Sequence, residues 1–220
     1  PACIFNAKIR HHWINESKTW RSVERKSQEK KHGKIVVLFH AASTGEFEQL
    51  KPILKKMDRN RFFIIQSFFS STVFNIEKKT SLADATCYHP FDFPWSAWRF
   101  FKRMNIQYYI TSRNDIWPFH LYIANRMKIH SALINANLYR KSHYESYLLR
   151  SFYKKIFSQF DLILTGSDRL KKNLINLVPE KNIYITGDSR LDRVLERKKY
   201  EKSNLLPSSF DKSKNIIFGS

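Results

Sequence analysis

The chain has 220 residues, of which 42% are hydrophobic and 15% aromatic, so it is long and apolar enough for a globular core and excludes a disordered protein. Its 39 Lys and Arg residues against 19 Asp and Glu give a formal charge of +20, which indicates anionic partners: phosphorylated substrates, an acidic membrane surface or nucleic acid. No apolar run approaches the roughly 18 residues of a membrane span. Cys3 and Cys87 lack metal or redox spacing, which is typical of a reducing cytoplasm.

Apolar and polar segments alternate along the chain after a basic start. We expect strands at Ile35–Phe39, Phe62–Ser67, Gln107–Thr111, Ser131–Asn135, Leu162–Thr165 and Ile183–Thr186, and helices at about 45–57, 71–79, 94–104, 117–127, 144–158 and 167–177. Strands that alternate with helices favour right-handed βαβ crossovers. The pattern therefore predicts an α/β fold with a Rossmann-like parallel sheet and helices on both faces. Glycines closely follow several apolar runs, where a strand must turn into its next element: Gly45, Gly166, Gly187 and Gly219.

Composition divides the chain into four parts. We expect a basic N-terminal segment at 1–34, a Rossmann-like domain at 35–189, a polar and charged connector at 190–214, and the first residues of a second domain at 215–220. The chain starts with Pro1 instead of Met, and it ends just after a new apolar run at 216–218. We interpret it as a piece of a longer protein.

The most informative stretch, Ile35–Leu54, has a carboxylate between a strand and a helix. Gly45 interrupts the chain after the strand, and apolar residues then recur at helical spacing, so Glu46 lies in the strand-to-helix turn. Open α/β sheets bind ligands at such turns. A catalytic base here would need a substrate hydroxyl within reach, and His40, Ser43 and Thr44 share the loop. A structural alternative is open, because Thr44-Gly45-Glu46 also fits a helix cap.

Other carboxylates follow strands or precede helices in the same way. Asp115 comes after the strand at 107–111, and Pro118 suits the first turn of a helix. Asp115 is therefore either a site residue or a helix cap, and Asp92 and Asp188 have the same two interpretations.

The predicted helix 94–104 carries a stripe of aromatic residues. Trp95, Trp98 and Phe101 recur at every third position, and Arg99 and Lys102 directly follow Trp98 and Phe101. Such a stripe suits a membrane interface, where rings lie at headgroup depth and cations meet anionic lipid. The alternative is that the stripe packs against the sheet.

Several common site motifs are missing. The sequence has no P-loop, GxGxxG, HExxH or GxSxG, and its eight histidines have no ligand spacing. We therefore expect no metal and no dinucleotide cofactor. Nucleic-acid binding stays open on charge alone, without a motif to support it.

The segment His40–Gln49, HAASTGEFEQ, resembles the HAASxGEFEQ signature of the 3-deoxy-D-manno-octulosonic acid (Kdo) transferases, lipopolysaccharide enzymes of Gram-negative bacteria. Further segments resemble family elements in family order: 67–72 (SFFSST), 88–92 (YHPFD), 115–118 (DIWP), 187–192 (GDSRLD) and 218–220 (FGS). The chain departs from the family pattern at four positions. Asp115 replaces a Glu, Arg113 stands where many members have Glu, and Ser71 and Val73 replace the usual Pro and Gly.

The resemblance implies the N-terminal domain of a GT-B glycosyltransferase. Such a domain would bind the lipid A precursor (lipid IVA), while a C-terminal donor-binding domain would bind CMP-Kdo. Glu46 would be the general base that deprotonates an acceptor hydroxyl for inverting transfer, without a metal. The resemblance further implies acceptor contacts from a group of polar residues: His40, Ser43, Thr44, Ser70, Thr72, Asp92 and Asp115.

The same resemblance implies a location and a set of partners. Acceptor phosphates and the anionic surface of the inner membrane, on its cytoplasmic face, would account for the charge of +20, and no nucleic acid is expected. The isolated chain would bind acceptor weakly and transfer nothing. The alternatives are another GT-B glycosyltransferase, or a non-enzymatic basic module that binds anionic membrane or nucleic acid.

Overall fold

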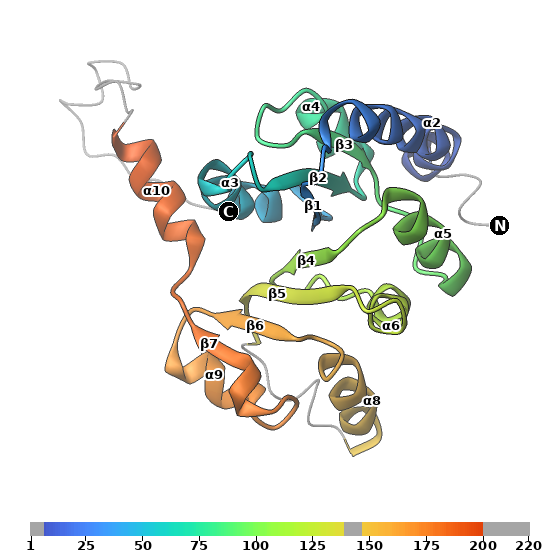
Figure 1. The fold of residues 1–220 in the computed structure, drawn as a ribbon. Coiled ribbons are helices and arrows are strands. Elements are labelled where there is room, and N and C mark those ends of the chain that lie inside the picture. Colours follow the sequence, from blue (N-terminus) through green and yellow to red (C-terminus); the bar gives the residue numbers. More distant parts are fainter. Residues whose placement is uncertain (1–6, 139–146, 200–220) are drawn as a thin grey trace.

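The structure, a computed structural model, describes residues 7–138 and 147–199, which form a seven-stranded parallel sheet with flanking helices (Figure 1). The helices and strands follow in chain order: α2 (Ala7–Lys30), β1 (Ile35–Ala41), α3 (Thr44–Lys56), β2 (Phe62–Phe68), α4 (Ser71–Glu77), β3 (Ala85–Tyr88), α5 (Pro94–Met104), β4 (Tyr108–Ser112), α6 (Pro118–Arg126), β5 (His130–Ala136), α8 (Tyr147–Phe157), β6 (Leu162–Thr165), α9 (Asp168–Leu174), the 3₁₀ helix η1 (Glu180–Asn182), β7 (Ile183–Ile185) and α10 (Ser189–Lys199).

The strand order is β3-β2-β1-β4-β5-β6-β7, and all of the described pairs are parallel. The chain first builds outward from β1 to β3 and then returns to the other side of β1. The order therefore reverses between β1 and β4. The predicted α/β, Rossmann-like class, that of the N-terminal domain of a GT-B glycosyltransferase, is confirmed.

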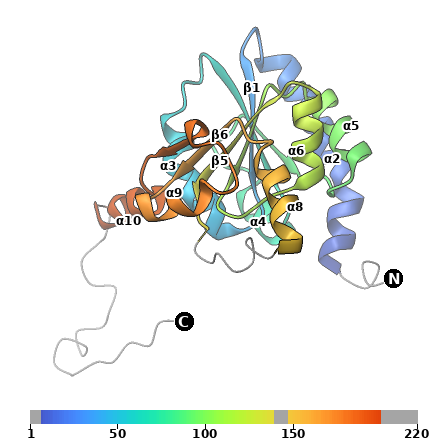
Figure 2. The same cartoon turned by 90° about the horizontal axis from the view of Figure 1, so that it is seen from below.

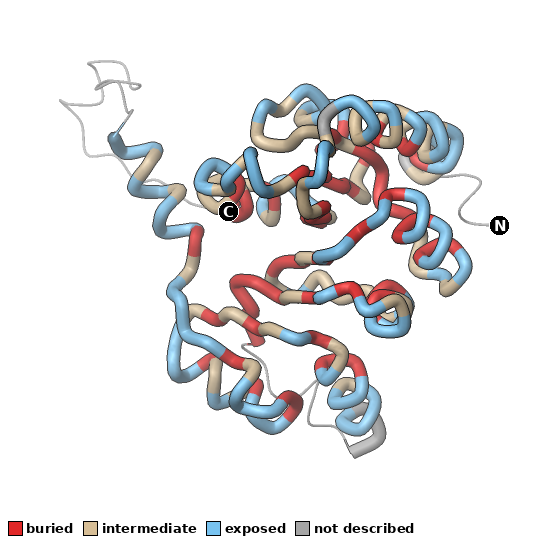
Figure 3. The backbone as a smooth tube through the Cα atoms, in the orientation of Figure 1, coloured by how far each residue is buried: buried red, intermediate tan, exposed pale blue. Residues whose placement is uncertain are grey.

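Helices cover both faces of the sheet, with α5, α6 and α8 on one side and α3 and α10 on the other (Figures 1 and 2). The interior strand β1 directs Val36 and Leu38 into one core, and Val37 and Phe39 into the other. A strand covered on both faces needs no polar alternation, which explains its continuous apolar run. Buried residues accordingly follow the strands, while the outer helix surfaces are exposed (Figure 3).

Helix α2 was not predicted. It packs over β3 through Trp20 and Val23, both buried, and the Trp20 indole donates to the carbonyl of Tyr88 at 3.0 Å. Its inward face also includes His12 and Glu16, so the apolar pattern of this face is too weak to indicate a helix.

Two further elements were missed. Strand β3 has only four residues and lies at the edge of the sheet. Helix α10 occupies the start of the predicted connector, and its many charged residues gave no apolar pattern from which to predict a helix. Ion pairs from Arg193 and Arg197 to Glu48 connect it to α3. Residues 200–214, the apolar run at 216–218 and the start of the expected helix at 144 lie outside the described residues. The division into domains stays a prediction.

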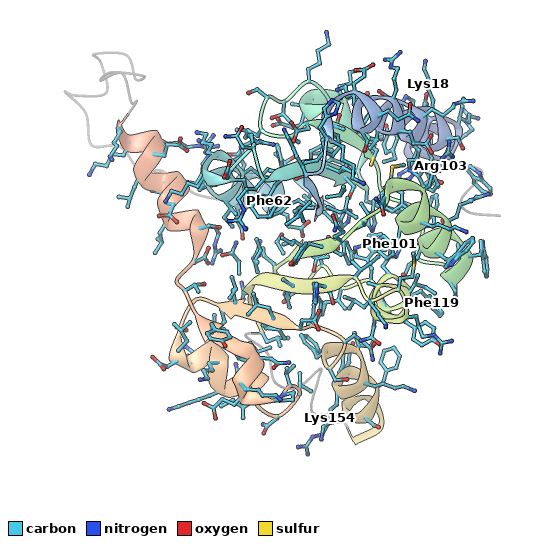
Figure 4. The ribbon with its side chains drawn as sticks, viewed as in Figure 1. Lys18, Phe62, Phe101, Arg103, Phe119 and Lys154 are labelled. Carbon is cyan, nitrogen blue, oxygen red and sulfur yellow. The ribbon has the colours of Figure 1, made fainter. Side chains whose placement is uncertain are left out.

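The aromatic stripe on α5 is divided between core and surface. Phe101 is completely buried beside the sheet (Figure 4), whereas Trp95 and Trp98 are 66% and 46% exposed. Phe101 therefore packs against the sheet, as the alternative interpretation predicted, whereas the two tryptophans do not. None of the helices in the described part of the chain has the length and apolar character to cross a bilayer.

Candidate active site

The site is built at the carboxyl ends of β1 and β4, where the strand order reverses. Glu46 lies in the first turn of α3, which follows β1, and Asp115 lies in the loop that follows β4. In open α/β sheets this position forms a crevice outside the strand ends. The fold therefore brings together two carboxylates that are far apart in the sequence.

Glu46 is held by a capping box. Its backbone N–H donates to Ser43 Oγ at 3.3 Å, while its Oε2 accepts from the N–H groups of Ala42 at 2.7 Å and Ser43 at 3.0 Å. A helix cap, which the sequence left as an alternative, is therefore present, but the capping residue is Ser43, and Thr44 is the first residue of the helix. It does not use the whole carboxylate, because no described residue donates a hydrogen bond to Oε1. The cap orients the group and leaves one oxygen open.

Asp115 is the most strongly perturbed carboxyl group near this loop. Burial, together with the neighbouring Glu46, raises the pKa of Asp115 to about 7, against the lowering effects of the Trp117 indole and the Ala42 backbone N–H. The indole donates to Asp115 Oδ1 at 2.8 Å. Because the Ala42 N–H acts on both carboxyl groups, Glu46 and Asp115 form a close pair.

A stack of buried imidazoles lies beneath the pair. The ring centroids of His40 and His89 are 3.7 Å apart, and those of His89 and His120 are 4.4 Å apart. All three side chains are fully buried, and burial lowers the pKa of each imidazole below its usual value. The Trp117 ring lies alongside the stack and is roughly perpendicular to all three imidazoles, at interplanar angles of 82°, 70° and 79°.

Carboxylates lie at both ends of this stack. His40 Nε2 is 3.2 Å from Asp115 Oδ2. At the other end, His120 Nδ1 is 2.8 Å from Asp92 Oδ1, which also accepts from the backbone N–H groups of Phe119 and His120 at the start of α6. Asp92 therefore acts as a helix cap in this structure and lies away from Glu46 in the chain of contacts.

The other residues expected to contact acceptor are placed as follows. Ser43 and Thr44 are exposed beside Glu46 at the start of α3, Ser70 is half-buried at the start of α4 without a side-chain capping bond, and Thr72 is exposed. His40 is completely buried. A direct contact between His40 and an acceptor does not agree with this burial, because its ring faces Ser67, His89 and Asp115.

Sequence reasoning missed the residues beneath the carboxylates: Ser67, His89, Trp117 and His120. Ser67, His89 and Trp117 stand in the segments 67–72, 88–92 and 115–118 that resemble family elements, but no spacing along the chain indicates that they meet. A usable signal was their common place near the ends of neighbouring parallel strands, which meet at one edge of the sheet. No group of three or more metal-ligating side chains occurs among residues 7–138 and 147–199.

The chain is a parallel α/β domain with two carboxylates at its switch point, and domains of this class typically bind ligands outside the carboxyl ends of the strands. The family model for 3-deoxy-D-manno-octulosonic-acid transferase (kdotransferase) matches residues 12–193, and the chain belongs to this family. A curated relative from Chlamydia muridarum, a 3-deoxy-D-manno-octulosonic acid transferase, is 27% identical over 194 residues. That match covers 86% of this chain and 44% of the relative, so the chain spans less than half of the relative's length.

Solved structures support the fold. A UDP-N-acetylglucosamine 2-epimerase from Rickettsia bellii matches with a TM-score of 0.57 at 9% identity, over 76% of this chain and 48% of that one. A UDP-GlcNAc 2-epimerase from Methanocaldococcus jannaschii matches with a TM-score of 0.54 at 15% identity, over 78% and 50%. At such low identity the likeness concerns the fold alone.

Proposed function

We propose that this chain is the acceptor-binding part of a Kdo transferase, an inverting glycosyltransferase that moves Kdo from CMP-Kdo to the lipid A precursor, lipid IVA, in lipopolysaccharide biosynthesis. Family membership supports the transferase class. The observation that carries the proposal is Glu46: a carboxylate at the switch point of the sheet, oriented by a cap on one oxygen and open on the other.

In this proposal Glu46 is the general base. Its Oε1 accepts the proton of an acceptor hydroxyl while the hydroxyl oxygen forms a bond to the anomeric carbon of Kdo. The bond from that carbon to the CMP phosphate breaks, and the electron pair leaves with CMP. General bases of this kind typically contribute about 100- to 10,000-fold to a rate. CMP-Kdo would be bound mainly by a part of the protein outside this chain, and no metal is needed for the proton transfer.

Polar groups at the same edge are proposed to hold the acceptor sugar. Ser43 and Thr44 lie beside Glu46 with exposed side chains, and Thr72 is exposed at the start of α4. Ser70 is half-buried at the same helix start. These hydroxyls suit the sugar hydroxyls and phosphate oxygens of a lipid A precursor. Asp115 is proposed to act beside Glu46 in the same acceptor site.

A surface between α2 and α5 is proposed to meet the anionic inner membrane on its cytoplasmic face. A groove of about 400 Å³ lies there, and four of its eight lining residues are aromatic: Ile9, Trp13, Glu16, Phe91, Phe93, Trp95, Ser96 and Arg99. Lys102 lies 4.7 Å from the centre of the neighbouring Trp98 ring. Exposed rings beside cations suit the headgroup region, where the rings meet acyl chains and the cations meet phosphate. Two further basic residues lie on these helices, Lys18 on α2 and Arg103 on α5 (Figure 4).

The groove and the carboxylates are connected by aromatic contacts. Phe91 lines the groove and contacts Phe69, with ring centroids 5.4 Å apart, and Phe69 contacts Trp117 at 5.0 Å. Trp117 in turn donates to Asp115. A lipid acceptor with its chains at the groove would thus present its sugar near the carboxyl edge of the sheet.

The proposal is tested by following radiolabelled lipid IVA on thin-layer plates with CMP-Kdo and the complete protein. We expect Kdo transfer by the complete protein and none by residues 1–220 alone. Turnover by the isolated chain would contradict the proposal that CMP-Kdo is bound mainly by a part of the protein outside this chain. Transfer only to other acceptors would favour a different GT-B glycosyltransferase, and salt-sensitive binding to DNA or RNA without transfer would favour a nucleic-acid module.

A further inference from the structure

The buried hydroxyl of Ser67 contacts two imidazoles and one carbonyl, and these contacts limit where the imidazole hydrogens can lie. Ser67 Oγ is 3.0 Å from Nδ1 of His40 and 3.0 Å from Nδ1 of His89, and it donates to the carbonyl of Phe39 at 3.3 Å. A hydroxyl has one hydrogen and two acceptor sites. The Phe39 carbonyl can only accept, and with the hydroxyl hydrogen on it both imidazoles donate from Nδ1.

The second nitrogen of His89 agrees with this assignment. Its Nε2 lies 3.4 Å from the hydroxyl of Tyr109, which can donate. Burial lowers the pKa of both His40 and His89 well below the usual value, so each ring is neutral and has a single N–H. Nε2 of each ring is therefore an acceptor.

The acceptor nitrogen of His40 faces another acceptor. His40 Nε2 is 3.2 Å from Asp115 Oδ2, and neither atom has another partner among the side chains that the structure describes. An ionised carboxylate and a bare imidazole nitrogen would repel each other at this distance. A proton on Asp115 Oδ2 turns the contact into an O–H···N hydrogen bond.

We propose that His40 is a positioning residue that holds Asp115 as a neutral carboxylic acid with its proton directed away from Glu46. The role for the reaction rests on the proposed function of Glu46. A proton on Asp115 leaves the negative charge of the pair on Glu46. Because that proton is directed to His40 Nε2, it does not occupy the Glu46 lone pair that an acceptor hydroxyl needs.

Titratable groups surround His40 and Asp115 from every neighbouring element. They are Glu46 on α3, Tyr109 on β4, His89 after β3, Asp92 before α5, His120 on α6, and His12 and Glu16 on α2. The histidines of the stack are neutral through burial, and Asp92 lies at the far end next to His120. Glu46 is therefore the charged group that acts directly on Asp115. Its negative charge disfavours the ionised form of Asp115.

The assignment is tested by NMR on the chain with labelled histidine and aspartate, with Asp115→Asn used to identify the Asp115 signal. We expect His40 with its hydrogen on Nδ1, and an Asp115 carboxyl signal that titrates near pH 7. A His40 hydrogen on Nε2, or an Asp115 already ionised at pH 5, would overturn the proposal. Both readouts use the unaltered chain and need no transferase activity, so they are independent of the proposed function.

Ser67→Ala tests the positioning role itself. Without the hydroxyl, His40 is free to carry its hydrogen on Nε2 and donate it to an Asp115 carboxylate, which should lower the Asp115 titration midpoint by about one pH unit or more. Ser131→Ala is the matched control, since it removes another buried strand hydroxyl, bonded to the carbonyl of Gln159, and should leave the midpoint unchanged. In the complete enzyme, a limb of the pH–rate profile should move with the midpoint. An unchanged midpoint in Ser67→Ala, or an equal change in both variants, would contradict the proposal.

Discussion

The Asp115→Asn variant should have a higher free energy of unfolding than wild type at alkaline pH. This gain over wild type should be smaller at acid pH. Burial and the neighbouring Glu46 raise the pKa of Asp115 from 3.8 to about 7. A raised pKa favours the folded state while the group is protonated. The associated stability is complete below about pH 4 and is lost as the pH rises through about 7.

The size of the effect follows from the two pKa values. The difference between 3.8 and about 7 corresponds to about 4 kcal/mol in the free energy of unfolding above pH 8, of which about 1.5 kcal/mol is already lost at pH 5. Asn has the shape of a protonated Asp, and its NH₂ group can donate to His40 Nε2. The stability gain of Asp115→Asn over wild type should therefore grow by about 3 kcal/mol between pH 5 and pH 8.5.

Urea denaturation followed by circular dichroism at pH 5, 7 and 8.5 measures this difference. Asp168→Asn, on the exposed surface of α9, is the control and should show no comparable growth with pH. A gain for Asp115→Asn that is the same at all three pH values would refute the reasoning, because it would mean that Asp115 ionises normally in the folded chain.

The remaining predictions concern the cap, the α3–α10 contact and the membrane surface. Ser43→Ala should lower the free energy of unfolding by about 1 kcal/mol, seen in urea denaturation, because the Glu46 N–H loses its acceptor. Burial alone would raise the pKa of Glu48, but hydrogen bonds from Lys51 and Arg193 lower it to about 2. Its stabilisation is present above about pH 4.5 and is lost as the pH falls towards 2, so Glu48→Gln should cost about 1 kcal/mol at pH 7, allowing for solvent screening, and less at pH 3. Trp95→Ser should weaken binding to anionic vesicles about tenfold, measured by co-sedimentation, because an exposed ring is removed from the proposed membrane surface.

Each of these has an outcome that would count against it. A Ser43→Ala variant as stable as wild type would mean that the cap does not hold α3. An equal cost of Glu48→Gln at pH 7 and pH 3 would exclude its ion pairs as the cause. Tyr184→Ser removes an exposed ring from β7, away from α2 and α5, and equal vesicle binding by it and by Trp95→Ser would exclude a localised membrane surface.

Local sequence patterns were enough to predict individual strands and helices and where some of them begin. The apolar run of β1, Gly45 after it and the spacing of α3 predicted that Glu46 lies where the strand passes into the helix, and the structure places it in the first turn of α3. Pro94 and Pro118 mark the starts of α5 and α6, and the predicted bounds of α5 were correct. The strand order was beyond this reasoning, because it depends on contacts between distant segments.

The same limit explains what was missed at the site. The eight histidines have no ligand spacing in the sequence, yet His40, His89 and His120 stack on one another once β3, β2, β1 and β4 form one sheet and α6 packs against it. Helix α2 has His12 and Glu16 on its packed face, so its sequence lacks the apolar periodicity that would predict a helix. Helix α10 is stabilised by ion pairs to α3, and a charged sequence gives no sign of its partner.

The central claim is that Glu46 is the base that activates the acceptor. The most direct test is the initial rate of Kdo transfer from CMP-Kdo to lipid IVA by the complete protein carrying Glu46→Gln. Gln keeps a side-chain oxygen that can accept from Ala42 and Ser43, so the cap and the fold are retained. We predict a rate about 100- to 10,000-fold lower than wild type, with Glu48→Gln close to wild type. A Glu46→Gln enzyme that turns over at the normal rate would contradict the account.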